Sequence, residues 1–214
     1  MKKIICLLLV SILLIRANAQ TKFGITAGAH LSDFSSATTA GIDASSSNFF
    51  HGGLVVDRKL GASSFNIMAE ALYTINGYEN SNIIATDKEG TNIGYIGSEK
   101  IGYVQIPVLA LYRFDFSHSS AKVGLGPYVA FKTNETMTIE SGGDVFKNTL
   151  SPMNTTGVSS CIGGAEIYAS LDLSRFFISA QYDYGFSNIY QNADTHDTKW
   201  KLNTVGFSLG FFLK

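Results

Sequence analysis

At residues 65–75 the chain reads FNIMAEALYTI, and this stretch decides the fold. An apolar residue stands at every second position from Phe65 to Ile75, with Asn66, Glu70 and Thr74 among the residues between them. A repeat of two places alternate side chains on opposite faces of a β-strand. The stretch therefore predicts a strand with one fully apolar face and one mixed face.

Seven further segments show the same repeat. They cover residues 22–31, 50–56, 104–114, 122–132, 164–173, 176–184 and 204–211. After the N-terminus no stretch has the length and apolar content of a membrane helix, and none keeps a helical apolar repeat over several turns. The sequence therefore predicts an all-β fold with eight strands.

The connections between these segments alternate in length. Long connections cover residues 32–48, 79–100, 134–157 and 187–199, and short ones cover 59–63, 117–120 and 173–175. Outer-membrane barrels have this rhythm, with long extracellular loops and short periplasmic turns. We therefore expect an eight-stranded antiparallel up-and-down transmembrane β-barrel in the outer membrane of the cell.

The composition of the two strand faces indicates which one lies inside. The faces opposite the apolar ones are rich in Gly, Ser and Thr, with isolated charges such as Lys132 and Asp183. The outer surface of a soluble barrel would carry more Lys and Glu. A membrane barrel turns its apolar face to lipid and its polar face to the lumen, and the pattern favours this arrangement.

Aromatic residues collect near the two ends of the predicted strands, as the interfacial belts of a membrane barrel require. The belt expected at the short turns contains Phe23, Phe65, Tyr112, Phe114, Phe116, Phe176, Phe177, Phe211 and Phe212. The belt expected at the long loops contains Phe49, Phe50, Tyr78, Tyr103, Phe131, Tyr184, Phe186 and Trp200.

Two prolines, Pro107 and Pro127, fall inside predicted strands. Proline lacks the backbone N–H that a strand ladder uses, so inside sheets it is found mainly at edges and bulges. We therefore expect bulges or kinks at both positions.

Residues 1–19 have the features of a cleaved secretory signal peptide. A basic start at Lys2 and Lys3 precedes an apolar run over residues 4–15 and the small-residue exit Ala-Asn-Ala at 17–19. The apolar run is too short for a stop-transfer helix. We expect export, followed by a barrel domain over residues 20–214.

Charge and cysteine content exclude other classes of protein. The chain of 214 residues has a net charge of -1, and without the signal segment it keeps 13 basic and 17 acidic side chains. No basic run follows the N-terminus, so the electrostatic footprint of nucleic-acid binding is missing. Cys161 is the single cysteine of the mature chain, so an internal disulfide is excluded.

Short motifs recur along the predicted strands. They are FGITAG at 23–28, AEALY at 69–73 with Gly77, YVQIP at 103–107, YRF at 112–114, GLGPY at 124–128, GGAE at 163–166, QYDYG at 181–185 and NI at 188–189. Together they resemble the PorT-like outer-membrane β-barrel family of Bacteroidetes over nearly the whole mature chain. The resemblance implies an eight-stranded barrel, in a family with one member linked to a protein-secretion and gliding system.

Five polar side chains are expected to point into the lumen: Glu70, Gln105, Lys132, Glu166 and Asp183. Charges in such a space must be paired or hydrated. An eight-stranded barrel is just wide enough to be filled by side chains. We therefore predict a structural polar network that closes the barrel to solutes.

Residues that carry chemistry are sparse, and we expect no cofactor, metal or catalytic site. The four histidines are isolated in sequence, and Asp194, His196 and Asp197 are interpreted as a solvated loop. His30 and Ser32 lie on the same strand face, and Ser and His are the residue types that some small membrane-barrel esterases use. The nearby acid, Asp33, should point to the opposite face.

Three classes of function remain open. The expected one is a non-enzymatic outer-membrane barrel, surrounded by outer-membrane lipid, whose loops 32–48, 79–100, 134–157 and 187–199 meet an envelope or secretion-system protein. The second is a lipid-modifying esterase of the outer membrane. The third is a soluble exported barrel that holds an apolar ligand.

Overall fold

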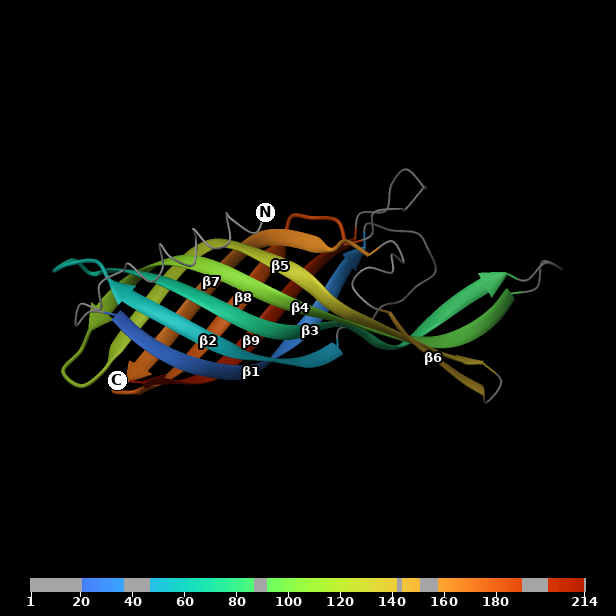
Figure 1. Cartoon of the computed structure of the whole chain (residues 1–214), viewed down its shortest axis with the longest axis horizontal. Coiled ribbons are helices and arrows are strands. Elements are labelled where there is room, and N and C mark those ends of the chain that lie inside the picture. Colours follow the sequence, from blue (N-terminus) through green and yellow to red (C-terminus); the bar gives the residue numbers. More distant parts are fainter. Residues whose placement is uncertain are drawn as a thin grey trace, which may run out of the picture.

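The computed structural model describes residues 21–36, 47–86, 92–141, 144–150, 158–189 and 200–213, and the regular elements in these residues are β-strands (Figure 1). They are β1 (Thr21–Ser36), β2 (Ser47–Lys59), β3 (Phe65–Thr86), β4 (Asn92–Asp115), β5 (Ser120–Ser141), β6 (Asp144–Leu150), β7 (Cys161–Leu173), β8 (Phe176–Gly185) and β9 (Trp200–Leu213). In this part of the chain, no helix long and apolar enough to cross a membrane is found.

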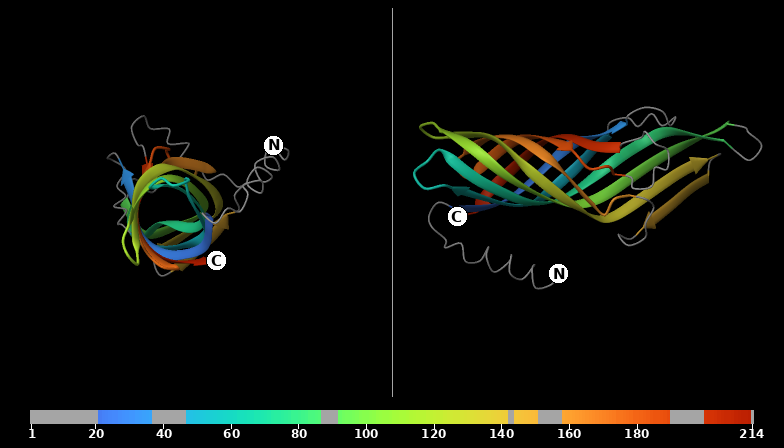
Figure 2. Two further views of the ribbon diagram at one scale, coloured as in Figure 1. Left: turned by 90° about the vertical axis from the view of Figure 1, so that its left-hand side faces the viewer. Right: turned by 90° about the horizontal axis from the view of Figure 1, so that it is seen from above.

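Eight of the strands close into a ring. They pair antiparallel in the order β4-β3-β2-β1-β9-β8-β7-β5, and the pairing of β4 with β5 completes the circle. The end-on view in Figure 2 shows the closed ring. The first and last strands pair from Phe23 opposite Leu213 to Ser36 opposite Trp200. The predicted eight-stranded antiparallel barrel is confirmed.

The sheet extends beyond the ring at one end (Figure 1). β3 and β4 stay paired out to Thr86 and Asn92, and β5 continues to Ser141 and pairs there with β6. The loops expected at 79–100 and 134–157 are therefore largely paired strands, and this part of the prediction is wrong. Strands that project beyond a bilayer need no apolar face, so the extension lacks the sustained repeat that marks the ring.

The other connections agree better with the prediction. Three tight turns join β2 to β3, β4 to β5 and β7 to β8, and they lie at the end opposite the extension. We name these two ends the turn end and the hairpin end. Of the expected loops 32–48 and 187–199, residues 37–46 and 190–199 lie outside the described residues, while β1 runs on to Ser36 and β2 begins at Ser47.

Side chains of the ring alternate between the outer wall and the lumen as predicted. Apolar side chains on the outer wall are exposed, including Phe50 at 71%, Phe207 at 68% and Leu125 at 64%. The side chains between them, such as Thr26 and His30, are buried inside. A soluble barrel that holds an apolar ligand needs the reverse orientation, so that alternative is wrong.

Aromatic side chains follow the same alternation, which corrects the expected belts. Members of both belts lie exposed on the outer wall, for example Phe65 at the turn end and Phe131 at the hairpin end. Five others are buried in the lumen: Phe49, Tyr78, Tyr103, Phe177 and Phe212. Phe211 and Phe212 illustrate the reason, because neighbouring residues of a strand face opposite ways and only one of them can face outward.

The two prolines leave the strand register unchanged. Pro107 and Ala110 share one register with β5, and Pro127 lies in a continuous register with β7. Beside Pro107, Val108 and Leu109 have no partners in the β4–β5 ladder, but neither strand has an extra residue there. The prediction of bulges at the prolines is therefore wrong. The register between β4 and β5 shifts instead between Gly102 and Tyr103, where the extension leaves the ring.

Candidate functional site in the barrel lumen

Side chains fill the lumen in three layers between the turn end and the hairpin end. We name them the turn-end layer, built around Lys122, the central layer, built around Asp183, and the hairpin-end layer, built around Lys132. All three of these charged side chains are buried. The packing around each of these side chains determines whether the lumen is open to solutes.

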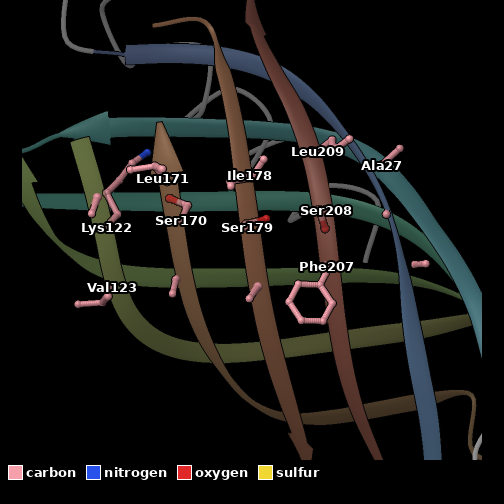
Figure 3. A pocket seen from close by; sticks show the side chains of 15 residues that line it. Ala27, Lys122, Val123, Ser170, Leu171, Ile178, Ser179, Phe207, Ser208 and Leu209 are labelled. Carbon is pink, nitrogen blue, oxygen red and sulfur yellow. The ribbon is translucent and has the colours of Figure 1, made fainter. Parts of the chain in front are cut away.

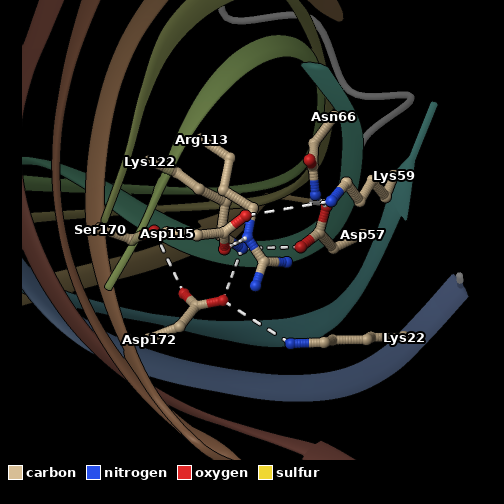
Figure 4. A network of polar contacts seen from close by, with 9 residues as sticks. All are labelled: Lys22, Asp57, Lys59, Asn66, Arg113, Asp115, Lys122, Ser170 and Asp172. Carbon is tan, nitrogen blue, oxygen red and sulfur yellow. Dashed lines mark hydrogen bonds and ion pairs between the residues drawn. The ribbon is translucent and has the colours of Figure 1, made fainter. Parts of the chain in front are cut away.

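In the turn-end layer, a buried lysine holds two acids together (Figure 4). Lys122 Nζ on β5 lies 2.6 Å from Asp57 Oδ2 on β2 and 2.9 Å from Asp172 Oδ2 on β7. Asn66 Nδ2 donates to Asp57 Oδ1 at 2.7 Å, and Lys22 Nζ lies 3.9 Å from Asp172 Oδ2. Buried charges are tolerated when they are paired and hydrogen-bonded, as here. The layer therefore cross-links strands on different sides of the ring.

Apolar and aromatic side chains pack around these charges. They are Val55, Met68, Leu109, Leu111, Tyr168, Phe177 and Phe212. The ring centroids of Phe177 and Phe212 are 4.7 Å apart, and Lys122 Nζ lies 5.3 Å from the Phe212 centroid, within cation–π range. A β-carbon at Gly210 would collide with the Phe177 ring, so a glycine is required beside it. This packing seals the turn end around the ion pairs.

The central layer is acidic. Asp183 Oδ2 accepts hydrogen bonds from Gln105 Nε2 at 3.1 Å and from Thr204 Oγ1 at 2.7 Å. Glu166 is fully buried, with the Asp183 carboxyl and the Gln105 amide as its polar neighbours. Glu70 is buried near the same two carboxyls and interacts electrostatically with them. Three carboxyl groups and one amide thus meet in the middle of the lumen.

A pair of histidines lies beside this acidic group. His30 Nδ1 and His51 Nδ1 are 3.1 Å apart. His30 Nε2 donates toward Ile75 O and Asn76 Oδ1, at 3.0 and 3.1 Å. His51 Nε2 lies 2.7 Å from Ser208 Oγ, which in turn bonds to Gln181 Oε1 at 3.3 Å. A hydrogen-bonded chain thus crosses the lumen from β3 to β8.

The space left between the histidines and the acids is small. A cavity of about 10 Å³ is lined by His30, His51, Leu72, Thr74, Gln105, Gln181, Asp183 and Thr204. A cavity of this size is at the lower limit for a single water molecule. The central layer is therefore closed to anything larger.

The hairpin-end layer combines an ion pair with an apolar lid. Lys132 Nζ lies 3.0 Å from Glu135 Oε2 and donates to Val158 O at 3.5 Å. Val158 and Ile189 belong to a buried cluster with Tyr78, Ile101, Tyr103, Tyr128, Ala130, Ile162 and Leu202. Ser159 N donates to Ile189 O at 2.6 Å, which ties the two covering segments together. The lumen is therefore covered at this end as well.

The structure places all five predicted lumen residues inside the barrel. Glu70, Gln105, Glu166 and Asp183 meet in the central layer, and Lys132 lies in the hairpin-end layer with Glu135 as its ion-pair partner. The five do not form one continuous network among themselves. Each reaches the lumen because it occupies a position between outward-facing apolar residues.

Sequence reasoning missed the turn-end layer. Lys122, Asp57 and Asp172 stand on the inward faces of their strands, close to the short turns. The strand positions of Lys122 and Asp172 were the available signal, since these residues alternate with exposed apolar residues such as Val123 and Leu173. His30 and His51 carry the same signal on two neighbouring strands. The positions of Lys122 and Asp172 predict buried charges near the short turns, although they do not predict which of the charges pair.

Of the residues considered for other chemistry, His30, Ser32 and Asp33 lie among the described residues. His30 bonds to His51 and Asn76, and Ser32 Oγ accepts a hydrogen bond from Gly77 N at 3.4 Å. Asp33 is exposed on the outer wall. Within the described ranges, His, Cys, Asp and Glu form no group of three that could hold a metal ion. Asp194, His196 and Asp197 lie outside those ranges.

A closed ring of eight strands with an apolar outer wall and a filled polar lumen defines an integral outer-membrane β-barrel protein. Residues 18–191 match the model of the outer membrane protein beta-barrel domain family. The chain belongs to that family, and the predicted location in the outer membrane is confirmed. The turn end accordingly lies on the periplasmic side and the hairpin end on the extracellular side.

Solved structures with a similar fold come from several bacteria. Neisserial surface protein A (NspA) is 14% identical, with a TM-score of 0.45, and the match covers 90% of this chain and 96% of NspA. Ail, the attachment invasion locus protein of Yersinia pestis, is 13% identical, with a TM-score of 0.44 and coverage of 91% and 99%. The N-terminal barrel domain of Pseudomonas aeruginosa OprF is 14% identical, with a TM-score of 0.31 and coverage of 91% and 100%. No curated protein matches the chain.

Proposed function

We propose that this protein is a non-conducting, non-enzymatic outer-membrane barrel that holds extracellular hairpins in place for an envelope or secretion-system protein. The observation that carries the proposal is the filled lumen. Ion pairs and aromatic rings close the periplasmic end, the apolar lid closes the extracellular end, and about 10 Å³ remains free in the central cavity. A barrel filled in this way offers solutes no path, so its function lies on its surface.

The extracellular extension supports a role in presentation. β3, β4 and β5 have 22, 24 and 22 residues, whereas β8 has 10. A tilted strand of about 9–11 residues spans a bilayer, so the longer strands project well beyond it. Strand pairing runs from the ring into the extension, with a register shift in each of the β3–β4 and β4–β5 ladders, and holds the hairpins to the ring. A protein that presents a surface to a partner requires hairpins that are held in place in this way.

The surroundings of the esterase candidates support a non-enzymatic barrel. Acyl transfer needs a nucleophile, a base and an orienting acid within reach of one another and of the substrate. Ser32 is 1% exposed, and Asp33 points to the outer wall, away from His30. Release of acyl chains from lipopolysaccharide by the purified protein, abolished by Ser32→Ala, would establish an esterase instead.

The proposal includes a more specific family and a route of export for this protein. The motifs described above support a PorT-like protein of Bacteroidetes, exported by a signal peptide over residues 1–19 and cleaved before Gln20. N-terminal sequencing of the protein purified from outer membranes tests the cleavage and should begin at Gln20. A mature protein that keeps residues 1–19 contradicts the export route.

Planar-bilayer recordings test the closed lumen. The refolded mature protein should give no stable ohmic conductance, and regular conductance steps of one size would overturn the proposal. Orientation is tested on intact cells with an epitope tag inserted between Thr86 and Asn92. That tag should bind antibody from outside, whereas a tag after Ala62 in the β2–β3 turn should bind only after the cells are permeabilised.

A further inference from the structure

The outer wall of the barrel is hollowed where two alanines pair. Ala169 on β7 stands opposite Ala180 on β8. The same row continues to Phe207 on β9 and to Val123 on β5, so larger side chains flank the alanines on both sides. The hollow has a volume of about 630 Å³, and most of the surface that it exposes is apolar. Figure 3 shows the residues that line it, with Ala27, Phe207 and Leu209 among them. It faces the hydrocarbon region of the membrane.

A second hollow continues the first toward the periplasm. It has a volume of about 340 Å³ and shares Ala27, Ile178 and Leu209 with the first. Phe176 and Phe211 line its periplasmic part, with ring centroids 5.1 Å apart. The two hollows form one groove along β8 and β9, which we name the lipid groove.

A cation stands at the periplasmic end of the lipid groove. Arg175 lies in the β7–β8 turn, directly before Phe176, and is exposed. Within the described part of the chain, the ion pairs do not include Arg175. Its carbonyl oxygen accepts a hydrogen bond from Phe212 N at 2.8 Å, which holds the turn against β9. The backbone of Arg175 is therefore held at the periplasmic end of the groove, and its exposed guanidinium places a positive charge within reach of a lipid headgroup there.

The length of the groove matches one leaflet. Five positions separate Arg175 from Ala180. At about 3.3 Å per residue and a strand tilt of about 40°, they span roughly 13 Å along the membrane normal. The apolar band of an outer-membrane barrel is about 25 Å tall, so its half is roughly 12 Å. Arg175 thus lies at headgroup level when the alanine pair lies near the midplane.

We propose that the lipid groove binds one anionic phospholipid of the periplasmic leaflet. The Arg175 guanidinium pairs with the lipid phosphate, and an acyl chain follows the groove over the paired rings of Phe176 and Phe211 and ends over Ala169 and Ala180. The guanidinium fork suits a phosphate group, because it can donate two parallel hydrogen bonds. A groove that leads from a cation at the surface to a hollow at the midplane has the chemistry of a lipid, with its charged head and apolar tail.

Native mass spectrometry of the full mature protein tests the proposal. The protein is released from detergent micelles to which phosphatidylglycerol or phosphatidylcholine has been added. One phosphatidylglycerol should remain bound, and phosphatidylcholine should be retained less. Arg175→Gln should lower the apparent affinity for phosphatidylglycerol about tenfold, as expected for a lost charge-assisted contact.

Ala180→Phe fills the hollow and should abolish retention of the lipid. Ala110→Phe is its matched control, because Ala110 is also exposed on the outer wall but lies on β4, away from the groove. Both substitutions face lipid, so both variants should fold and show the boiled-against-unboiled gel shift of a closed barrel.

Three outcomes overturn the proposal. The first is equal retention of both lipids by the unmodified protein. The second is equal loss of lipid in the Ala180→Phe and Ala110→Phe variants. The third is a dimer that Ala180→Phe disrupts, which would assign the groove to a second copy of the chain.

Discussion

Lys122 and Asp57 form an ion pair of 2.6 Å in which each side chain is 1% exposed, and the pair joins strands β5 and β2, which are not neighbours in the sheet. Backbone pairing connects each strand only to those beside it, so this contact braces the ring across its interior. Because both charges are out of water, the loss of one leaves the other uncompensated.

Lys122→Met should therefore be strongly destabilising. It leaves Asp57 and Asp172 buried without their main cation, which costs about 3–5 kcal/mol of unfolding free energy. Urea unfolding of the protein folded in lipid vesicles measures the loss. Lys59→Met is the control, since Lys59 and Asp115 form an exposed pair of 3.9 Å, worth at most about 1 kcal/mol. Equal losses in the two variants would show that the lumen pair is solvated.

Gly210→Ala should destabilise the barrel through the Phe177 ring. The added β-carbon collides with that ring, and overpacking of this kind costs about 1–3 kcal/mol. The double variant Gly210→Ala, Phe177→Leu should recover part of the loss, because the smaller side chain makes room. The same unfolding titration compares the two. A double variant less stable than the sum of its single changes would refute this packing.

Ser208→Ala tests the hydrogen-bonded chain in the central layer. The hydroxyl of Ser208 lies 2.7 Å from His51 Nε2, and its removal leaves a buried ring nitrogen without that partner. The expected cost is about 1–3 kcal/mol in urea unfolding. Ser117→Ala, in the exposed β4–β5 turn, should change stability by less than about 0.5 kcal/mol. A neutral Ser208→Ala would mean that water replaces the hydroxyl.

Shortening the β3–β4 hairpin tests whether the extension is separable from the ring. Replacing residues 82–96 with a tight turn should leave a closed barrel with an unchanged gel shift, because those residues pair beyond the ring. Deleting Ala69 and Glu70 from β3 should prevent folding, since both lie within it. If the shortened hairpin also prevents folding, the extension is part of the folding unit, and presentation is not its main role.

The ring could be predicted because its physics is local. Each residue of a strand such as β3 faces either lipid or the lumen, so the sequence from Phe65 to Ile75 carries its orientation in its own alternation. The burial of Glu70 and Asp183 follows from that alternation alone. The inward position of Phe212 follows in the same way. Each aromatic residue has to be assigned to a face by its own place in the alternation, and not by its distance from the end of the strand.

Contacts across the lumen could not be predicted in the same way. Whether Lys122 meets Asp57 depends on the stagger of strands three places apart in the ring, which no single strand records. The histidine contact depends on register as well: His51 stands opposite Gly28, and a β-carbon at Gly28 would collide with the His51 ring. The extension was missed for another reason, because a strand with water on both sides needs no apolar repeat.

The pairing of β1 with β9 sets a condition on assembly. Every other neighbouring pair in the ring joins strands that are close in the chain, but this one joins residues about 180 positions apart, such as Ala27 and Leu209. An N-terminal portion of the barrel that lacks β9 therefore has two open edges and cannot enter lipid as a closed wall. Closure of the wall therefore depends on a contact between the two ends of the barrel sequence, and it is complete only when β9 has paired with β1.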